Sequence, residues 1–309
     1  MHELTRSEDP AHGVHLALLG LVADARHALS GRELSDESIH QSRKSLKKCR
    51  AALRLLRDAI SESVFQRENR VLRDIARPLS AARDASVLLE TLSRLEKLYG
   101  PAARESIPAS LRKALKAEEA EVTRGIGHAN GKRPPAGAAL KRVERRLARM
   151  TVARNGWDDV GNSLKRVYRG GRRAMKDARS TPTAECLHEW RKQTKHLWHQ
   201  LQLLEPLWPG TVGELADQAH RLSDYLGDDH DLAVLRETVD KHRTLFTGSG
   251  GAGALLALID RCRSRLQEKA FLLGGRIYDE RPTEFAARFG RFWKRWRRES
   301  ARQPALSAP

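Results

Sequence analysis

Cysteines, aromatic residues and long apolar runs are all scarce in this sequence of 309 residues. Its three cysteines lie far apart, which argues against a disulfide framework or a zinc site and favours reduced thiols in helices: Cys49, Cys186 and Cys262. No apolar run approaches the roughly 18–20 residues that a membrane-spanning helix needs. The first ten residues are acidic and make a poor secretory signal. We therefore expect a soluble cytoplasmic protein that does not associate with membranes.

Motifs of common enzymes are also missing. The sequence has no glycine-rich phosphate loop ending in Gly-Lys-Ser/Thr, no His-Glu-x-x-His and no Gly-x-Ser-x-Gly. Asp228 and Asp229 lie at a predicted helix start, where carboxylates are favoured by the helix dipole. Asp84 and Asp231 are interpreted as helix N-terminal residues or as partners that orient an arginine. The sequence thus predicts no catalytic residue and no cofactor.

Acidic residues are too few to balance the basic ones. Lys and Arg number 57 and Asp and Glu 39, which gives a net charge of +18. Residues 1–154 contain 30 basic and 19 acidic residues, and the remainder contains 27 and 20, so the two parts carry +11 and +7. Because both parts carry the excess, it belongs to folded surfaces rather than to a basic tail. Such a charge predicts an anionic partner without identifying it.

The residues that are abundant indicate helices almost throughout. Arg, Leu, Ala, Glu and Lys dominate, and no strand-like alternation is sustained. Helix starts are predicted at Ser35-Asp36, at Pro182-Thr183 and at Asp228-Asp229. Breaks are predicted at 99–101, 127–137, 206–210, 248–253 and 281–282, with 127–137 the best candidate for a mobile loop. We expect ten to twelve helices in an all-α bundle.

An internal repeat divides the chain. Ile39–Lys44 recurs as Leu187–Lys192, which places His40 in register with His188 at an offset of 148. Two further segments keep the same order at offsets of 147 and 146: Leu79 to Leu88 matches Leu226 to Leu235, and Arg26 to Leu29 matches Arg172 to Met175. Three matches in order at nearly constant offset indicate a duplication.

The first copy of the repeat forms a helix with two contrasting faces. At about 100° per residue, its apolar residues fall within about 80° of one another: Ile39, Leu46, Cys49, Leu53, Leu56 and Ile60. Basic residues fill an arc of about 140° on the other side: His40, Arg43, Lys44, Lys47, Arg50, Arg54 and Arg57. A solvated face usually alternates acids with bases, yet no acid lies between Gln41 and Arg57. This pattern predicts an anion-binding site.

The second copy is less basic. Its stripe begins in the same way with His188, Arg191, Lys192 and Lys195, but Trp198 and Gln202 replace the later arginines. Cations of the preceding helix are expected to compensate: Lys165, Arg169, Arg172, Arg173 and Lys176. Arg26 and His27 occupy the comparable place in the first half.

Each of these residue types also has a structural explanation. A capping or packing role is the usual explanation for a histidine near a helix start, but the repetition of His40 and His188 with Arg and Lys at +3, +4 and +7 favours a binding site. Arg145-Arg146 and Arg297-Arg298 are interpreted as solvated, and Phe289, Phe292, Trp293 and Trp296 as core. For His196 and His199, no cysteine or acid lies nearby in sequence, so no metal is expected.

These residues resemble the CHAD family, the conserved histidine α-helical domain. The similar segments are Ile39 to Leu56, Leu187 to Leu204, Leu79 to Leu89, Leu226 to Leu235 and the closing Gly274 to Trp296. The resemblance implies one CHAD domain made of two pseudo-twofold-related helical bundles, residues 14–153 and 154–300, with a central basic channel. It further implies non-catalytic binding of inorganic polyphosphate and, in some members, association with polyphosphate granules. Trp198, Gln202 and His230 depart from the family's pattern.

Two rival functions remain open. A nucleic-acid-binding protein would have similar electrostatics, although few aromatic residues are available to stack on bases and no helix-turn-helix, RNA-recognition or zinc-finger pattern is present. A phosphohydrolase or phosphotransferase could use His40 or His188, but no general acid or metal site accompanies either histidine.

Overall fold

The computed structural model describes residues 4, 9–29, 36–129, 136–246 and 251–302, and these residues form helices and turns but no strand. The prediction of an all-α protein with ten to twelve helices is confirmed. The elements are α1 Pro10–Ala28, α2 Asp36–Leu55, α3 Glu62–Ala76, α4 Pro78–Tyr99, α5 Pro101–Ser106, α6 Ala109–Ala129, α7 Ala136–Ala148, α8 Trp157–Ser180, α9 Ala184–Leu204, α10 Pro209–Lys241, α11 Gly251–Ile277 and α12 Pro282–Arg302, with short 3₁₀ turns η1 Glu205–Leu207 and η2 Arg243–Leu245.

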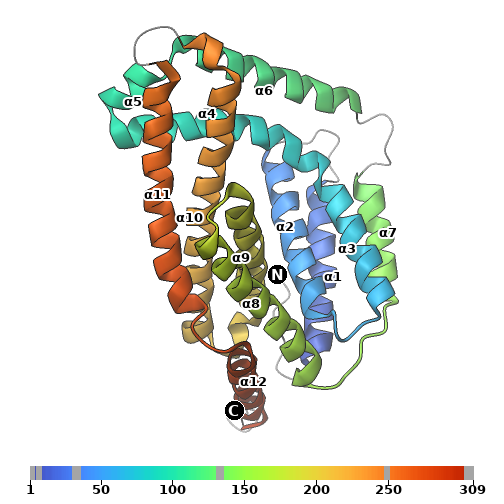
Figure 1. Ribbon diagram of the computed structural model, residues 1–309. Helices are drawn as coiled ribbons and strands as arrows, with labels where there is room; N and C mark the ends of the chain where they lie inside the picture. Colours follow the sequence, from blue (N-terminus) through green and yellow to red (C-terminus); the bar gives the residue numbers. More distant parts are fainter. Residues whose placement is uncertain (1–3, 5–8, 30–35, 130–135, 247–250, 303–309) are drawn as a thin grey trace, which may run out of the picture.

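The long helices stand side by side (Figure 1). Helices α1, α2, α3 and α7 pack together on one side, and α10 and α11 pack against each other on the other side. Helices α8 and α9 lie between them, and α9 contacts both α2 and α10. Helices α4 and α6 cross one end of the molecule, while α12 lies at the opposite end. Helix α9 therefore joins the two groups of helices.

Most predicted helix boundaries are confirmed. Helix α4 ends at Gly100, whose φ of +59° favours glycine, and Pro101 begins α5. Pro209 and Pro282 begin α10 and α12, where a missing N–H costs nothing. Helix α2 begins at Asp36 but ends at Leu55, so the predicted extension to Ile60 is wrong. Two predicted breaks are too long, because 127–129 and 136–137 of the predicted mobile loop belong to α6 and α7, and 251–253 of another break belong to α11. Their remaining residues, 130–135 and 248–250, lie outside the described residues.

Thr183 caps the helix that contains His188. Its φ and ψ are −77° and 158°, and its hydroxyl accepts a 3.2 Å hydrogen bond from the Cys186 backbone N–H. We expect Thr183→Ala to lower the free energy of unfolding by about 1 kcal/mol, because the N–H loses its acceptor. Urea denaturation measures the change, and Thr183→Ser, which keeps the acceptor, serves as the control. Equal stability of the alanine variant and the wild type would contradict this role.

The predicted helix start at Asp228-Asp229 is wrong, because α10 continues through these residues without a break. Asp229 is buried and accepts hydrogen bonds from Arg263 Nε at 3.0 Å and Gln267 Nε2 at 2.8 Å. A carboxylate that binds side chains of a neighbouring helix can therefore lie in the middle of its own helix rather than at its start. Asp231 is likewise not a helix N-terminal residue, but its predicted pairing with an arginine is confirmed, since Arg94 Nη2 lies 3.4 Å from its Oδ2.

The side chain of Asp84 lies outside the described residues, although its backbone belongs to α4.

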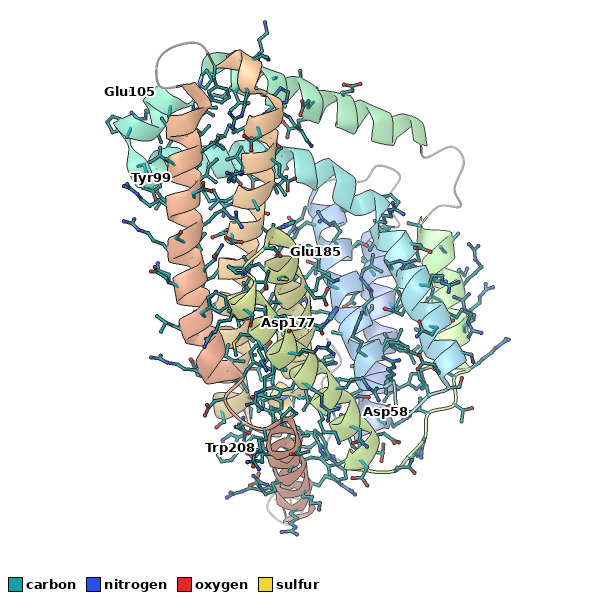
Figure 2. The ribbon with its side chains drawn as sticks, viewed as in Figure 1. Asp58, Tyr99, Glu105, Asp177, Glu185 and Trp208 are labelled. Atoms are coloured by element: carbon teal, nitrogen blue, oxygen red, sulfur yellow. The ribbon has the colours of Figure 1, made fainter. Side chains whose placement is uncertain are left out.

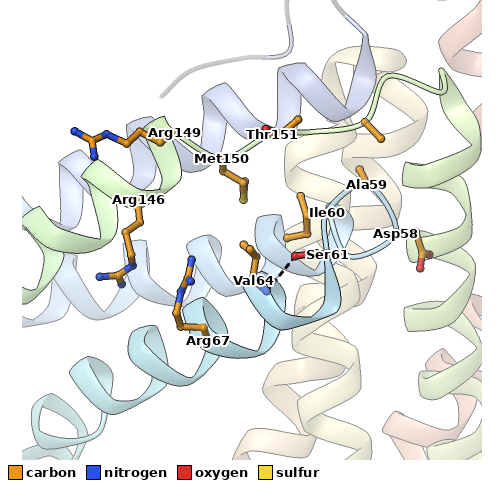
Figure 3. Close-up of a pocket in the computed structure, with 11 residues that line it drawn as sticks. Asp58, Ala59, Ile60, Ser61, Val64, Arg67, Arg146, Arg149, Met150 and Thr151 are labelled. Atoms are coloured by element: carbon orange, nitrogen blue, oxygen red, sulfur yellow. Dashed lines mark hydrogen bonds between the residues drawn. The ribbon is translucent and has the colours of Figure 1, made fainter.

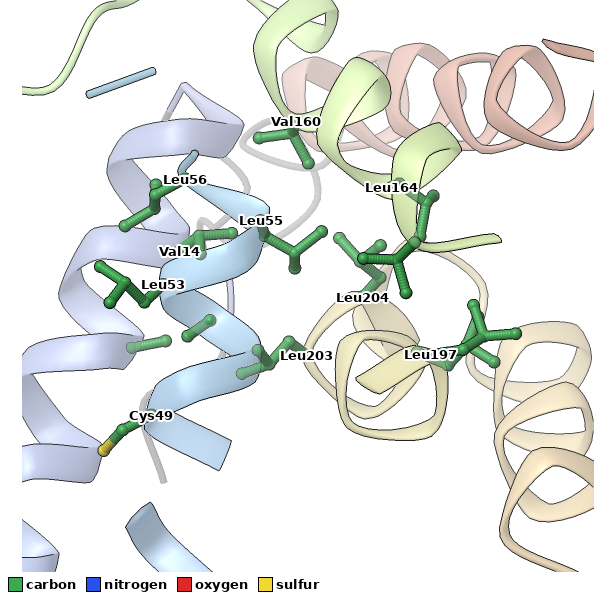
Figure 4. Close-up of a cluster of buried hydrophobic side chains, with 14 of the residues drawn as sticks. Val14, Cys49, Leu53, Leu55, Leu56, Val160, Leu164, Leu197, Leu203 and Leu204 are labelled. Carbon is green, nitrogen blue, oxygen red and sulfur yellow. The ribbon is translucent and has the colours of Figure 1, made fainter. Parts of the chain in front are cut away.

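Two clusters of buried hydrophobic residues hold the helices together. The larger cluster contains the apolar faces of α1, α2, α8, α9 and α12 (Figure 4). The smaller cluster joins residues of α4, α5, α6, α10 and α11. Phe289, Trp293 and Trp296 are buried in the larger cluster and Phe292 packs against it, so their prediction as core residues is confirmed. The three cysteines form no disulfide, as predicted.

Candidate functional site

The two histidine helices are neighbours. Helix α2 packs against α9, and Gln200 Nε2 on α9 donates a 3.4 Å hydrogen bond to the Ala51 carbonyl on α2. The apolar face predicted for α2 is buried, and Cys49, Leu53 and Leu56 are fully inaccessible. Its basic side chains lie on the other faces and are half-buried or exposed. The sequence pattern therefore places the basic residues of α2 on sides of the helix that do not face the hydrophobic core.

Basic residues of α2 and α9 gather where the two helices meet. We call this group the α2–α9 cation cluster: Lys47, Lys48, Arg50, Arg54, Lys195, His196 and His199. The charges of Arg54 and Arg50 act on His196, and those of Lys48 and Lys47 act on His199. Lys195 is subject to repulsion from Arg191 and Lys47. The cluster therefore brings together basic residues of two helices that lie between 141 (Arg54 to Lys195) and 152 (Lys47 to His199) positions apart in the chain.

Burial and mutual repulsion both disfavour positive charge in this cluster. Burial, followed by repulsion from Arg191 and Lys47, lowers the pKa of Lys195 to about 7. Burial lowers the pKa of His199 to about 4 and that of His196 well below its ordinary value. Burial also lowers the pKa of Arg54 to about 10. An anion placed here would reverse these effects, because it favours every charged form.

On the α2 side of the cluster, the acid Asp24 acts on Lys48, whereas Arg50 and Arg54 bond to uncharged groups. Arg50 Nε donates to Asn69 Oδ1 at 3.2 Å, and Arg54 Nη1 donates to the Arg50 carbonyl at 3.0 Å, so both bonds are made to uncharged acceptors. Arg57, by contrast, pairs with the carboxylate of Glu62 at 2.9 Å. Within the described part of the chain, the buried Nε2 of His199 has no hydrogen-bond partner.

The amino-terminal ends of both stripes differ in burial. On α9, His188 is half-buried and its ring centre lies 4.4 Å from that of His230 on α10. Burial, followed by repulsion from His230, lowers the pKa of His188 to about 4. Arg191 lies over Gly227, where an added Cβ would be 3.3 Å from its Nη2. On α2, His40 and Lys44 are exposed and Arg43 is half-buried.

Acidic residues border the cluster on the α10 side. A cavity of about 810 Å³ is lined by the basic residues Arg94, Lys97, Arg191 and Lys195, and by the acidic residues Glu90, Asp224, Asp228 and Asp231. Arg94 pairs with Asp228 and with Asp231. Burial raises the pKa of both Asp224 and Asp231. This acidic wall limits how far an anion can extend toward α10.

The remaining predicted binding residues lie elsewhere. Arg26 on α1 pairs with Glu144 on α7 at 2.9 Å. The α8 cations are half-buried or exposed, and Arg173 lies 3.8 Å from Asp177 on the same helix: Lys165, Arg169, Arg172, Arg173 and Lys176. The described contacts do not join these residues to the α2–α9 cation cluster.

A second cavity, of about 800 Å³, lies between the turn after α2, α3 and the end of α7 (Figure 3). Its Arg67 and Arg146 both bind the buried Glu68, with Nε to Oε1 distances of 2.7 Å. Since this carboxylate already holds both arginines, the cavity is a weaker candidate for binding a polyanion.

Sequence reasoning missed part of the site. The sequence pattern indicates His196 and His199 only as possible metal ligands and does not indicate Lys48. Positions 188, 192, 195, 196 and 199 nevertheless follow one side of a helix, and this spacing is the signal that would include both histidines. Trp198 stacks on His220 of α10 at a ring-centre distance of 3.8 Å, and Gln202 lies 3.2 Å from His199 Nδ1. Among the described residues, no group of three or more His, Cys, Asp or Glu side chains could hold a metal.

No helix among the described residues is both long and apolar enough to span a bilayer.

Comparison with known protein families identifies one family. The CHAD domain profile matches residues 17–240. The solved structure of PptA from Streptomyces chartreusis is similar to this chain, with a TM-score of 0.64 and 13% sequence identity; the match covers 88% of this chain and 100% of that one. No curated protein matches the sequence significantly.

Proposed function

The chain belongs to the CHAD domain family, and from this membership we propose that it binds inorganic polyphosphate without catalysing a reaction on it. The observation that carries the proposal is the α2–α9 cation cluster, in which Lys195 has a pKa lowered to about 7 by burial and by Arg191 and Lys47. Packing cations against one another destabilises a protein unless a counter-charge arrives. A polymer with a charge on every unit supplies that counter-charge over the length of the cluster.

Each residue type in the site suits a phosphate chain. Arg43 and Arg191 have planar guanidinium groups that can hold two non-bridging oxygens at once. Lys44, Lys47, Lys192 and Lys195 act as flexible point charges. His40 and His188 can donate a ring N–H, and a bound phosphate favours their protonated form. The site thus recognises charge spacing rather than a base or a sugar.

The finer features of the family are part of this proposal. We propose that residues 14–153 and 154–300 are duplicated halves, and that a basic channel runs between their histidine helices. The proximity of α2 and α9 supports this arrangement, since His40 and His188 occupy equivalent positions on the two helices. We also propose a cytoplasmic protein that associates with polyphosphate granules.

A triple substitution on α2 tests the function. His40→Ala, Arg43→Ala and Lys47→Ala together are expected to weaken polyphosphate binding about tenfold at fixed salt, because three phosphate contacts of modest individual strength are lost. Isothermal titration calorimetry measures the affinity.

The matched control removes three exposed cations from α12 by Arg291→Ala, Lys294→Ala and Arg298→Ala. Near wild-type affinity of the α2 variant, or an equal loss in the α12 variant, would contradict the proposed site. Two further assays address the rivals. Preference for RNA or duplex DNA at matched charge concentration would indicate a nucleic-acid-binding protein, and phosphate release from polyphosphate with a divalent metal would indicate an enzyme.

A further inference from the structure

Helix α8 carries a basic stripe on its outward side, separate from the α2–α9 cation cluster. Lys165, Arg169, Arg172 and Lys176 follow one another at intervals of four, three and four residues. At about 100° and about 1.5 Å per residue, they lie within an arc of about 60° and span about 16 Å along the helix. Arg169, Arg172 and Lys176 are exposed and Lys165 is half-buried. We call these four residues the α8 stripe.

No acid interrupts this stripe. Between Asp159 and Asp177, α8 contains six basic residues and no acidic residue. The nearby acids are bound to cations outside the stripe, since Asp58 pairs with Arg166 at 2.9 Å and Asp177 lies 3.8 Å from Arg173. In Figure 2, Asp58 lies beside one end of α8 and Asp177 near the other end. A solvated helix face usually contains acids among its bases, so this composition indicates an anionic partner.

The opposite side of α8 fixes the direction in which the stripe points. Leu164, Tyr168 and Ala178 are buried, and Tyr168 donates a 2.9 Å hydrogen bond to the Ile277 carbonyl. Gly171 packs so closely that a Cβ there would lie 2.4 Å from Tyr278 Oη. Helix α8 therefore cannot rotate to bring the stripe toward the core. The stripe faces solvent.

Polar residues of α9 lie at its contact with α8. Helix α8 contacts α9 at Gly170, where an added Cβ would be 3.0 Å from Gln193 Oε1. Gln193 Nε2 in turn donates a 2.7 Å hydrogen bond to Glu189, which also pairs with Lys192. The carboxylate of Glu189 is thus held by Gln193, which lies at the α8–α9 contact, and by Lys192.

We propose that the α8 stripe is a second binding surface for the same polyphosphate chain, an inference that rests on the proposed function. Long chains reach both surfaces and short chains occupy only the α2–α9 cation cluster. Polyphosphate is favoured over nucleic acid because Tyr168 is fully buried, which leaves the stripe without an aromatic ring for base stacking. A chain that is already bound at the first surface has a raised effective concentration at the second surface, so the overall affinity increases although binding at the first surface is no stronger.

The test compares chain lengths. The α8 variant combines three substitutions, Arg169→Gln, Arg172→Gln and Lys176→Gln. Its affinity for long-chain polyphosphate is expected to fall about tenfold, while its affinity for tetrapolyphosphate stays unchanged. The control variant, Arg291→Gln, Lys294→Gln, Arg298→Gln, removes the same charge from the outer face of α12 and is expected to bind both lengths as the wild type does. All substituted residues are exposed, so circular dichroism should report an unchanged fold.

The possible failures are distinct. If the α8 variant keeps its affinity for long chains, loses affinity for both lengths equally, or loses no more than the α12 variant, the second surface is refuted. A loss confined to duplex DNA of matched charge also refutes it. If wild-type protein binds neither polyphosphate length, the proposed function itself is wrong, and this inference is wrong with it.

Discussion

The affinity for polyphosphate is expected to rise about a hundredfold as the pH falls from about 8.5 to about 6. Lys195, with a pKa of about 7, is the main cause above neutral pH. At the higher pH it is mostly uncharged in the unbound protein, so binding a polyanion must be accompanied by uptake of a proton. Below its pKa the charge is already present and this cost disappears. The affinity therefore rises as the pH falls through the pKa of Lys195.

Histidines continue the effect at lower pH. Burial holds the pKa of His188 and of His199 at about 4, so both are neutral near pH 6 in the unbound protein, and burial also lowers the pKa of His196 well below its ordinary value. A bound phosphate raises each pKa, and proton uptake at these sites then favours binding as the pH falls.

Burial sets the direction of these pKa shifts, and the charged groups around the residues modify their size. Lys195 is near Arg191 and Lys47, and near the acids Asp224 and Asp231. His196 is near Arg54 and Arg50 on α2 and near Lys192 on its own helix, and His199 is near Lys48, Lys195 and Lys47. Because the cations outnumber the acids and the site is buried, the unbound protein favours the neutral forms.

Calorimetry in two buffers with different ionisation enthalpies measures the proton uptake directly. Lys195→Arg is the control, since a guanidinium keeps its charge and should remove most of the pH dependence above about pH 7 while preserving affinity. A wild-type affinity that does not change across this range, or no difference between the arginine variant and the wild type, would contradict the assignment to Lys195.

The second large effect concerns stability without ligand. Lys195→Met is expected to raise the melting temperature by about 5 °C near pH 7, which corresponds to about 2 kcal/mol for a chain of this size. Lys195 has its pKa lowered to about 7 in the folded protein, whereas an unfolded lysine is protonated up to about pH 10.4. The folded state therefore binds its proton more weakly, and this penalty is largest below pH 7. Loss of the attraction to Asp224 and Asp231 offsets part of the gain.

Differential scanning calorimetry at two pH values tests this sign. The advantage of the methionine variant should shrink as the pH rises from about 7 toward about 10, because unfolded lysine then also loses its proton. Saturating polyphosphate should reverse the order of the two proteins, since only the wild type gains the ligand's full stabilisation. A lower melting temperature for the methionine variant without ligand would contradict a repulsive cluster.

The sequence predicted the local structure better than the contacts between distant segments. The apolar and basic faces of α2 followed from the spacing of Cys49, Leu53 and their neighbours, because residues three or four positions apart lie on the same side of a helix. Thr183 marked a real helix start for the same reason, since a cap depends only on residues close in sequence. Asp228-Asp229 carried a similar signal but lies inside α10, because Arg263 and Gln267 on α11 bind Asp229. A contact with a different helix cannot be recognised from local sequence.

The residues that make up the candidate site also could not all be predicted from local sequence. The repeat identified His40 and His188, but it could not show that His196 would face Arg50 and Arg54 across the α2–α9 contact. The repeat also could not show that the α8 cations lie apart from the cluster. Residue spacing shows which residues share one side of a helix, but it does not show which other helix packs against that side. The acidic wall on α10 depends on how α9 and α10 pack together, so it too emerges only from the fold.

The unbroken course of α10 has a consequence for the cooperativity of folding. Its first part, through Leu226, belongs to the larger hydrophobic cluster, and its last part, from Leu232, belongs to the smaller one. The residues between them include Gly227, beneath Arg191, and Asp228 and Asp231, in the acidic wall. Melting of either cluster would fray the same helix at this junction. The proposed anion site on α9 thus borders the segment of α10 at which the two cores meet, and we expect an anion that contacts Arg191 to stabilise both parts of α10 against unfolding together.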